Sequence, residues 1–532
     1  MISCYVLKMN FLSFYQRVNH KTFSIECFLL ALFLIANFLL KYWHWNEPIE
    51  TDLLMYCMGG HTFHINKLLY VNLWDQKPPL IHFLYAVAES FFGYGKGEVR
   101  AVNIFFSSAL IIELWWIAKR CHSNIVSLTL LMLFLVIGIF PNIEYEVNQP
   151  NCELIVNVFL AFGFISLIAN YKNVKKYSLF GLSVLAASMV KHHSVIPMTS
   201  LAIASIIIYP SNKVSSRLGF LVACFSSLVI GWAILFIFYI NIHHFSDIWL
   251  CLVSSNASYN PNYIDTILKA FYWKNLAFLI ISLFGPAMII YSQRSGALRN
   301  ISLFAISLSI GCYTMLAIPG MWWPHYYQLM ILPIYISVVL ILVCFCKTKS
   351  RTGLILITLF ITTICSYNIF NYISLSDLQI SEKKYKGPWF KDTELVAPII
   401  KSLLTENEWF FVWGQDPGLY VYTNIWPHTR FNTYFPFVFS KVQPKVYPIF
   451  FSDVCNDPPD LIIFPAPQVS MIGPNIADPI LDWIASNYFP VIGGEMARNY
   501  LICCRTGSKL SQRLPASVSK QPLKSIIRPL VQ

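Results

Sequence analysis

Residues 74–93 read WDQKPPLIHFLYAVAESFFG, and the interpretation of this stretch decides the topology of the whole chain. Its apolar part, 79–93, is short for a membrane span, contains Glu89 and begins at the second of two consecutive prolines. Most other apolar runs approach or exceed about 18 residues with almost no charge, as membrane-spanning helices do. All the apolar runs are 24–43, 79–93, 100–118, 124–140, 153–170, 177–190, 193–209, 218–240, 274–292, 300–318, 324–346 and 352–372.

The composition excludes a soluble protein with a large core. Of 532 residues, 56% are hydrophobic and only 12% are charged, whereas soluble proteins carry about 25% charged residues. The net charge is +12 at pH 7. Because the basic residues cluster in short gaps between apolar runs, they indicate cytoplasmic loops rather than contacts with nucleic acid. The chain is therefore predicted to be a polytopic integral membrane protein.

The basic loops test how many runs cross the membrane. With the basic N-terminus in the cytoplasm and every run spanning, the basic loops fall on the outer side, against the positive-inside rule. If 79–93 instead lies in the membrane interface, these loops all move to the cytoplasm. We therefore expect about eleven spans and an outer C-terminus. The loops concerned contain Lys119 and Arg120, Lys172 to Lys176, Lys213 and Arg217, Arg294 and Arg299, and Lys347 to Arg351.

This topology divides the chain into four parts. A cytoplasmic tail, 1–23, precedes a transmembrane domain, 24–372, whose first outer loop, 44–99, contains interfacial helices. Residues 373–508 alternate strand-like and helix-like runs, which predicts a small outer α/β domain. Residues 509–532 are basic and polar, which predicts disorder. The strand-like runs are 409–413, 461–464 and 500–504, and the helix-like runs are 395–404 and 480–487.

Two ionisable residues of the first outer loop are candidates for chemistry, since such residues at a membrane face are often functional. Asp52 follows Thr51, a possible helix cap, and Tyr56 lies on the same helical face four residues on. Lys77 precedes two prolines that stiffen the chain, and an ammonium fixed at this depth suits a lipid-linked phosphate. The ordinary alternative is a loop aspartate and a lysine that anchors the interface.

Three acids gather at another predicted outer loop. Glu144 and Glu146 lie in the loop, and Glu153 opens the next apolar run. Together they can bind a metal, activate an acceptor or simply be solvated. Lys191 and His325 also lie at outer ends of apolar runs, where aromatic and basic residues are common in any membrane protein.

A second possible metal site has helical spacing. Cys57, His61 and His64 are suitably placed along one helix. Gly59 and Gly60 are expected to break that helix, which favours a structural role for these residues.

The first outer loop resembles that of the C-superfamily membrane glycosyltransferases. The resemblance rests on Asp52, Tyr56, Gly60 and Tyr70, followed by WDQKPPL at 74–80. The nearest branch is the bacterial group related to dolichyl-phosphate-mannose protein mannosyltransferases and to the aminoarabinose transferase acting on lipid A. The resemblance extends over roughly residues 24–440 of this chain. Supporting elements are Gly93, Arg100 to Asn103, Asn148 to Glu153, His325 to Leu329, Pro333, Val412 to Gly414, Pro417, Leu419, Tyr420 and Thr429 to Phe431.

The chain departs from that pattern beside the loop aspartate. Members of the superfamily often have a second acid directly after it, whereas this chain has Leu53 there and Glu50 before it. Either Asp52 or Glu50 is therefore the working acid, and Asp52 is preferred by similarity.

The resemblance implies an inverting glycosyltransferase in a bacterial inner membrane that uses a polyprenyl-phosphate-linked sugar as donor. The acceptor is a lipid, a glycan or a protein, and a divalent metal ion is a possible cofactor. Asp52 would act as the catalytic base. By the same resemblance, Lys77, Lys191, His325 and Tyr326 would bind the donor phosphate, and Glu153 and Glu146 would serve the acceptor or a metal.

Two other functions compete with this one. A transporter or flippase of lipid-linked glycans should place ionisable residues near the middle of the membrane and show repeat symmetry. A non-catalytic envelope assembly subunit would use the tail to bind a partner, but this leaves Asp52 and Lys77 without a role. The acids gather at one face here, which favours the enzyme.

Overall fold

The structure is a computed structural model of the chain. It describes residues 20–122, 146–169, 173–208, 214–257, 263–293, 295–320, 322–347, 351–385, 387, 389–438, 442–465, 478–492, 499–515 and 518. The expected span 124–140 and Glu144 lie outside these residues.

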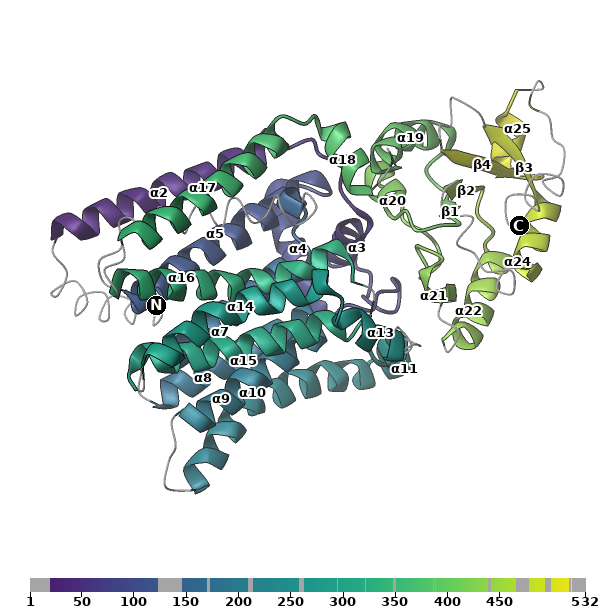
Figure 1. Cartoon of the computed structure of the whole chain (residues 1–532). Helices are drawn as coiled ribbons and strands as arrows, with labels where there is room; N and C mark the ends of the chain where they lie inside the picture. Colours follow the sequence, from purple (N-terminus) through teal and green to yellow (C-terminus); the bar gives the residue numbers. More distant parts are fainter. Residues whose placement is uncertain are drawn as a thin grey trace.

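Long helices form a bundle, with a smaller domain at one of its ends (Figure 1). Each apolar run that falls among the described residues is helical, because long apolar side chains can be buried or face lipid only if the backbone satisfies its own hydrogen bonds. The bundle helices are α2 (His20–Trp43), α5 (Lys96–Cys121), α7 (Cys152–Ile168), α8 (Asn173–Val190), α9 (Val195–Ile208), α10 (Val214–Asn241), α14 (Trp273–Ser292), α15 (Ala297–Ala317), α16 (Ile331–Lys347) and α17 (Arg351–Ile373).

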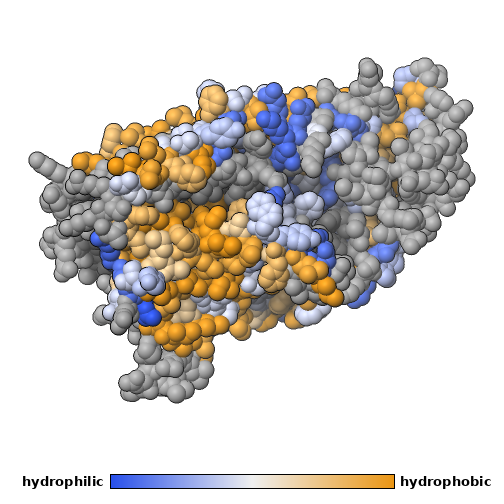
Figure 2. All heavy atoms as spheres, in the orientation of Figure 1, coloured by the Kyte–Doolittle hydropathy of each residue, from blue (hydrophilic) through white to orange (hydrophobic). Residues whose placement is uncertain are grey.

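Six of the described helices are long and apolar enough to cross a membrane, judged by length and composition. Large apolar side chains such as Ile234 and Phe284 lie on their outer surface, 63% and 56% exposed. Figure 2 shows hydrophobic side chains over this part of the molecule. The architecture is therefore that of an integral membrane protein, as predicted, while the total of about eleven spans stays a prediction.

The short run after the lysine–proline loop forms a separate helix, α4 (Pro79–Phe92), of 14 residues. At 1.5 Å per residue it is about 21 Å long, less than the ~30 Å hydrocarbon core. Glu89 near its end accepts from His61 Nδ1 at 2.7 Å. This length fits the expected interfacial position of 79–93.

Helix α4 packs against α3 (Thr51–His61), which continues through Gly59 and Gly60. The expectation that these glycines break the helix is wrong. A Cβ on Gly59 would lie 1.9 Å from His82 Nδ1, and one on Gly60 would lie 2.8 Å from the backbone nitrogen of Ala86. The glycines therefore allow the two helices to approach closely. Thr51 is the first helical residue and Glu50 holds the cap position, so the expected Thr51 cap is also wrong.

Inside the bundle, α14 contains Pro286, which cannot donate a backbone hydrogen bond. The hydroxyl of Ser337 on α16 accepts from the N–H of Gly285 at 2.9 Å and donates to the carbonyl of Ile281 at 2.6 Å. Ser309 on α15 donates to the next carbonyl, that of Ser282, at 3.4 Å. Neighbouring serines thus satisfy the backbone groups around the proline.

The tail contains a four-stranded mixed sheet of order β1-β2-β4-β3. β1 pairs parallel with β2, and β4 is antiparallel to both of its neighbours. The α/β domain is therefore confirmed, and it includes one strand that the sequence did not indicate, β3. The strands are β1 (Phe410–Val412), β2 (Leu461–Pro465), β3 (Tyr488–Ile492) and β4 (Tyr500–Arg505).

Helices surround this sheet. They are α18 (Asp377–Tyr385), α19 (Trp389–Leu403), α20 (Gly418–Thr423), α21 (Phe435–Val438), α22 (Gln443–Asn456), α24 (Asp478–Asn487) and α25 (Lys509–Arg513). Helix α25 falls within 509–532, the stretch expected to be disordered, so the first residues of that stretch are helical instead. Ser508 caps α25 by accepting from the N–H of Ser511 at 3.0 Å, and Arg513 pairs with Glu408 at 2.5 Å.

The tail contacts the end of the bundle that carries α3, α11 (Phe245–Trp249) and α13 (Tyr263–Ala270) (Figure 1). Arg430 of the tail pairs with Asp247 at 2.6 Å, and its carbonyl accepts from the N–H of Trp74 at 2.7 Å. The ring of Phe431 lies 5.6 Å from that of Trp74. The tail therefore supports the loop that leads to Lys77.

Candidate active site

Asp52 lies in the first turn of α3, where two basic side chains approach its carboxylate. Lys77 Nζ lies 3.7 Å from Asp52 Oδ2, and His325 Nε2 lies 4.0 Å from the same oxygen. Both distances exceed the roughly 2.7–3.2 Å of a nitrogen–oxygen hydrogen bond. The side chain of Asp52 is 34% exposed. Its carboxylate is thus surrounded by charge but keeps lone pairs open to a further group.

The second acid of the site is held differently. Glu153, in the first turn of α7, forms a short hydrogen-bonded ion pair with Lys191, which follows α8. Both side chains are almost fully buried. The ammonium of Lys191 also lies 4.0 Å from the centre of the Tyr326 ring, in η4 (Pro324–Met330). This pair joins α7, α8 and η4 at one point, and each of its charges is already neutralised.

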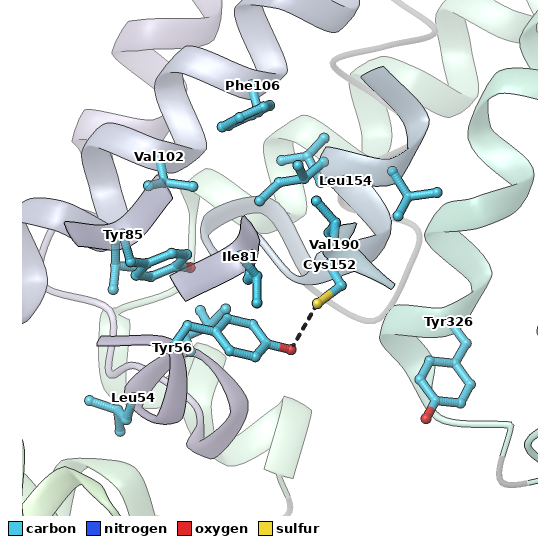
Figure 3. Packing of buried hydrophobic residues seen from close by; sticks show 14 of the residues in the cluster. Leu54, Tyr56, Ile81, Tyr85, Val102, Phe106, Cys152, Leu154, Val190 and Tyr326 are labelled. Carbon is cyan, nitrogen blue, oxygen red and sulfur yellow. Dashed lines mark hydrogen bonds between the residues drawn. The ribbon is translucent and has the colours of Figure 1, made fainter. Parts of the chain in front are cut away.

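Tyr56 lies one turn after Asp52 and links α3 to the start of α7. Its hydroxyl oxygen accepts a hydrogen bond from the thiol of Cys152 at 3.2 Å, as Figure 3 shows, and Lys77 Nζ lies 5.7 Å from its ring. Around this bond, Ile81 and Tyr85 of α4 and Leu154 of α7 form an apolar wall (Figure 3). The wall fixes the positions of the two helices that carry Asp52 and Glu153.

A buried aspartate shapes the loop of Lys77. Asp75 Oδ1 accepts from the N–H groups of Gln76 and Lys77 at 2.5 and 3.1 Å, and the hydroxyl of Tyr70 donates to the carbonyl of Lys77 at 2.7 Å. The other oxygen of Asp75 lies 3.1 Å from Nε2 of the fully buried His82. Asp75 and His82 therefore hold the backbone from which Lys77 extends, and the sequence analysis had assigned neither of them a role.

The charges around Asp52 set its ionisation. Burial raises the pKa of the Asp52 carboxyl, but Lys77, His325 and Lys191 outweigh this effect, so that its pKa is lowered overall. For Lys77, burial lowers the pKa, but Asp52, Cys152, Asp75 and Tyr326 together outweigh this effect, so that the pKa is raised well above the usual value. The site therefore holds an ionised acid beside an ionised lysine at neutral pH.

Glu50, the alternative acid, is buried, and both of its carboxylate oxygens already have partners. It accepts a short hydrogen bond from Asn151, and Lys384 of the tail lies 3.4 Å from its other oxygen. Of the two acids, only Asp52 is both partly exposed and close to Lys77. Glu50 instead connects α3 with α18 and with the loop before α7.

Six of the seven sequence candidates meet in this part of the molecule: Asp52, Lys77, Glu153, Lys191, His325 and Tyr326. Glu146 opens the short helix η1 (Glu146–Asn148), but its side chain lies outside the described residues. Within the described residues, no group of three or more His, Cys, Asp or Glu side chains is arranged to hold a metal ion. His61 and His64 share Glu89, at 2.7 and 3.8 Å, rather than forming a ligand set with Cys57.

The bundle, the α3–α4 hairpin with its lysine loop, and the small mixed domain together define a class of membrane-protein fold. The chain has the fold of the C-superfamily membrane glycosyltransferases. No protein-family profile and no curated protein sequence matches the chain, so that this assignment rests on structure.

Among solved structures, the chain is similar to ArnT from Cupriavidus metallidurans bound to undecaprenyl phosphate. The TM-score is 0.57 at 12% identity, over 90% of this chain and 98% of that one. The apo state of ArnT gives 0.54 at 11% identity, over 89% and 97%. AglB, the archaeal oligosaccharyltransferase of Archaeoglobus fulgidus, in complex with an inhibitory peptide and a dolichol-phosphate, gives 0.52 at 10% identity, over 92% and 75%.

Proposed function

We propose that the chain is an inverting glycosyltransferase acting at the outer face of the membrane. It moves a sugar from a polyprenyl-phosphate-linked donor to a hydroxyl or phosphate of an acceptor lipid, glycan or protein. The observation that carries this proposal is the environment of Asp52, which is ionised, partly exposed and 3.7 Å from Lys77. The undecaprenyl phosphate in ArnT and the dolichol-phosphate in AglB support a donor of this class.

The reaction needs a base near the acceptor oxygen and a counter-charge near the leaving phosphate. The acceptor oxygen forms a bond to the anomeric carbon while the bond from that carbon to the lipid phosphate breaks. The leaving phosphate keeps the electron pair, and a hydroxyl acceptor gives its proton to Asp52. Lys77 balances the negative charge that grows on the phosphate, and the imidazole of His325 lies beside it as a further hydrogen-bonding group. A phosphate acceptor is already an anion and needs no base.

Lys191 has a different place in this mechanism. Since Glu153 neutralises it inside the protein, it contributes mainly by holding α7, α8 and η4 together beside the donor phosphate. Lys77 is the more available cation, because its only described carboxylate contact is the looser one with Asp52. We therefore assign phosphate binding first to Lys77.

The closing experiment measures sugar transfer by purified protein from a panel of polyprenyl-phosphate sugars. Asp52→Asn keeps the shape of the side chain and removes the base, so kcat should fall about 10²–10⁴-fold for a hydroxyl acceptor. Lys77→Ala should instead raise KM for the donor and lower kcat/KM about 10²-fold or more. Lys391→Ala is the matched control, because this lysine pairs with Glu394 on the tail surface.

Transfer that survives both Asp52→Asn and Lys77→Ala would overturn the site assignment. The absence of transfer by the wild-type protein from every donor of the panel would remove the transferase proposal and favour a transporter or an assembly subunit.

The pH dependence gives a second check on Asp52. Since its pKa is lowered, the base stays ionised down to a pH below the usual Asp value of about 3.9. Wild-type kcat/KM should therefore show no acid limb from this group between about pH 5 and 8. An acid limb in that range that disappears in Asp52→Asn would show that the pKa of Asp52 is not lowered.

A further inference from the structure

Behind the ion pair of Glu153 and Lys191, buried polar side chains lie close together. Asn157 lies one turn after Glu153 on the same face of α7, and its Nδ2 donates to the carbonyl of Gln328 at 2.7 Å. Gln328 lies in η4, two residues after the Tyr326 ring that Lys191 covers. Asn157 and Gln328 are both fully buried. The two amides therefore continue the site inward from Glu153.

The segment after Lys191 forms another wall of this region. It is η2 (His192–Ser194), and both η2 and η4 pack against α15. The rings of His192 and His193 lie 4.1 Å apart and are half-buried, while Ser194 is fully buried. The imidazoles thus follow Lys191 directly in the chain and are less buried than the two amides.

These side chains have hydrogen-bonding capacity that the described residues do not use. Asn157 Oδ1, both Oε1 and Nε2 of Gln328, Ser194 Oγ, His192 Nε2 and His193 Nδ1 are buried and find no hydrogen-bond partner there. Buried polar groups are almost always paired, and a side chain amide with both ends unpaired is costly to keep. Their concentration beside Lys191 therefore points to a polar occupant.

The chemistry of these groups identifies the class of occupant. An amide offers an acceptor oxygen and a donor N–H₂, a neutral imidazole offers one of each, and a hydroxyl does both. A phosphate accepts hydrogen bonds only, and it is matched by the ammonium of Lys77 and the imidazole of His325. Sugar hydroxyls donate and accept, so they match a mixed, uncharged set of this kind.

We propose that Gln328, Asn157 and the two histidines, His192 and His193, bind the sugar ring of the donor and determine which sugar is accepted. This inference rests on the proposed function, in which Lys77 and His325 hold the phosphate of the same donor. The phosphate binds at the charged outer edge, and the sugar hydroxyls bind to the uncharged groups further inside. Sugar selection is thereby separated from phosphate binding.

The experiment compares the affinity of the full-length protein for polyprenyl-phosphate sugars and for sugar-free polyprenyl phosphate. The sugar-bearing panel contains a hexose, an aminopentose and a uronic acid. At least one of these should bind the wild type about tenfold more tightly than the sugar-free lipid, a difference of about 1.4 kcal/mol. Gln328→Met and His193→Phe, which keep the side-chain volume, should abolish that preference while sugar-free lipid binds within about twofold of wild type.

The thermal stability of the ligand-free protein separates this role from a structural one. Because Gln328→Met removes unpaired buried groups, its Tm should equal or exceed that of wild type. The control is Ser166→Ala on α7, the helix that carries Asn157. The hydroxyl of Ser166 donates to the carbonyl of Gly163 at 2.7 Å, and this variant should keep the preference for the sugar-bearing lipid.

A lowered Tm in Gln328→Met, or an unchanged preference in both variants, would overturn the inference. Equal binding of all lipids by wild type would overturn it as well. A preference that Gln328→Met removes, in a protein that transfers no sugar, would instead leave sugar binding standing and remove the transferase.

Discussion

At Gly59, the space that a side chain would need is filled by the ring of His82. A Cβ at position 59 would lie 1.9 Å from His82 Nδ1, and His82 in turn touches Asp75, which shapes the Lys77 loop. Gly59→Ala should therefore destabilise the protein by about 1–3 kcal/mol and lower its Tm. His82→Ala in the Gly59→Ala background should restore part of the loss, because the double variant relieves the overlap.

Gly219→Ala is the matched control for this comparison. Nothing lies within 4 Å of a Cβ at position 219 in α10, so this variant should be neutral or slightly stabilising. If Gly59→Ala behaves in the same way, the tight packing of α3 on α4 is wrong.

Asp416 in the tail predicts a pH effect on stability. Burial raises its pKa from 3.8 to about 6, although Tyr500 and Thr393 donate hydrogen bonds to it. Between these values the folded state keeps a proton that the unfolded state loses, so stability falls as the pH rises from about 4 to 6, by up to about 3 kcal/mol.

The corresponding measurement is denaturation of wild type and Asp416→Asn across this pH range. The difference between the two free energies of unfolding should change with pH and level off above about pH 6. A constant difference would show that Asp416 does not titrate in this window.

At the scale of helices, the contact of α14 with α16 depends on one hydroxyl. Ser337 accepts from the N–H of Gly285 and donates to the carbonyl of Ile281, one turn earlier on α14. Ser337→Ala should remove both hydrogen bonds between the two helices and cost about 1–3 kcal/mol, seen as a lower Tm in detergent. In Ser302→Ala, by contrast, the lost hydroxyl only donates to its own helix, at the carbonyl of Leu298, so this control should change Tm little.

The helices themselves were largely predictable, because long apolar runs have few alternatives to helix in a membrane. The sequence did not show that α3 continues through Gly59 and Gly60, because glycine has a low helix propensity. The reason for glycine at these two positions is the close packing of α4, which a sequence pattern does not show. Strand β3 was missed for a similar reason. Tyr488–Ile492 contains Pro490, which is tolerated because β3 is an edge strand.

At the scale of the whole molecule, the positions of the basic residues predict which side of the membrane each end of the bundle faces. Helix α16 runs from the site near His325 to Lys347, and α5 ends at Lys119 and Arg120, away from the tail. By the positive-inside rule we therefore expect the tail to lie outside. The exposed Cys455 of the tail should therefore react with a membrane-impermeant maleimide in right-side-out vesicles, and Cys455→Ser should lose most of this labelling.

Labelling of Cys455 only in inverted vesicles would reverse the topology and move the site to the cytoplasmic face. Such a result would remove the outer-face part of the proposed function without changing the fold.

The sequence placed the candidate residues at one end of the bundle, but it did not give their pairings. It offered Lys77 first and Lys191 after it as cations for the phosphate, but it did not show that Lys191 is bound to Glu153 while Lys77 only approaches Asp52. Which loops meet depends on how helices tilt and pack, and no local pattern encodes that. The role of Asp75 was missed because His82, its partner, lies in an apolar helix seven residues later and gives no signal of its own.

The contact of Arg430 with Trp74 has a consequence for biosynthesis. A membrane protein is made from its N-terminus, and the loop that carries Lys77 leaves the ribosome several hundred residues before its partner in the tail. Until residue 430 has been translated and the tail has folded, Trp74 lacks the carbonyl that its N–H binds. The nascent chain thus enters the bilayer before the Lys77 loop has the support that the tail provides.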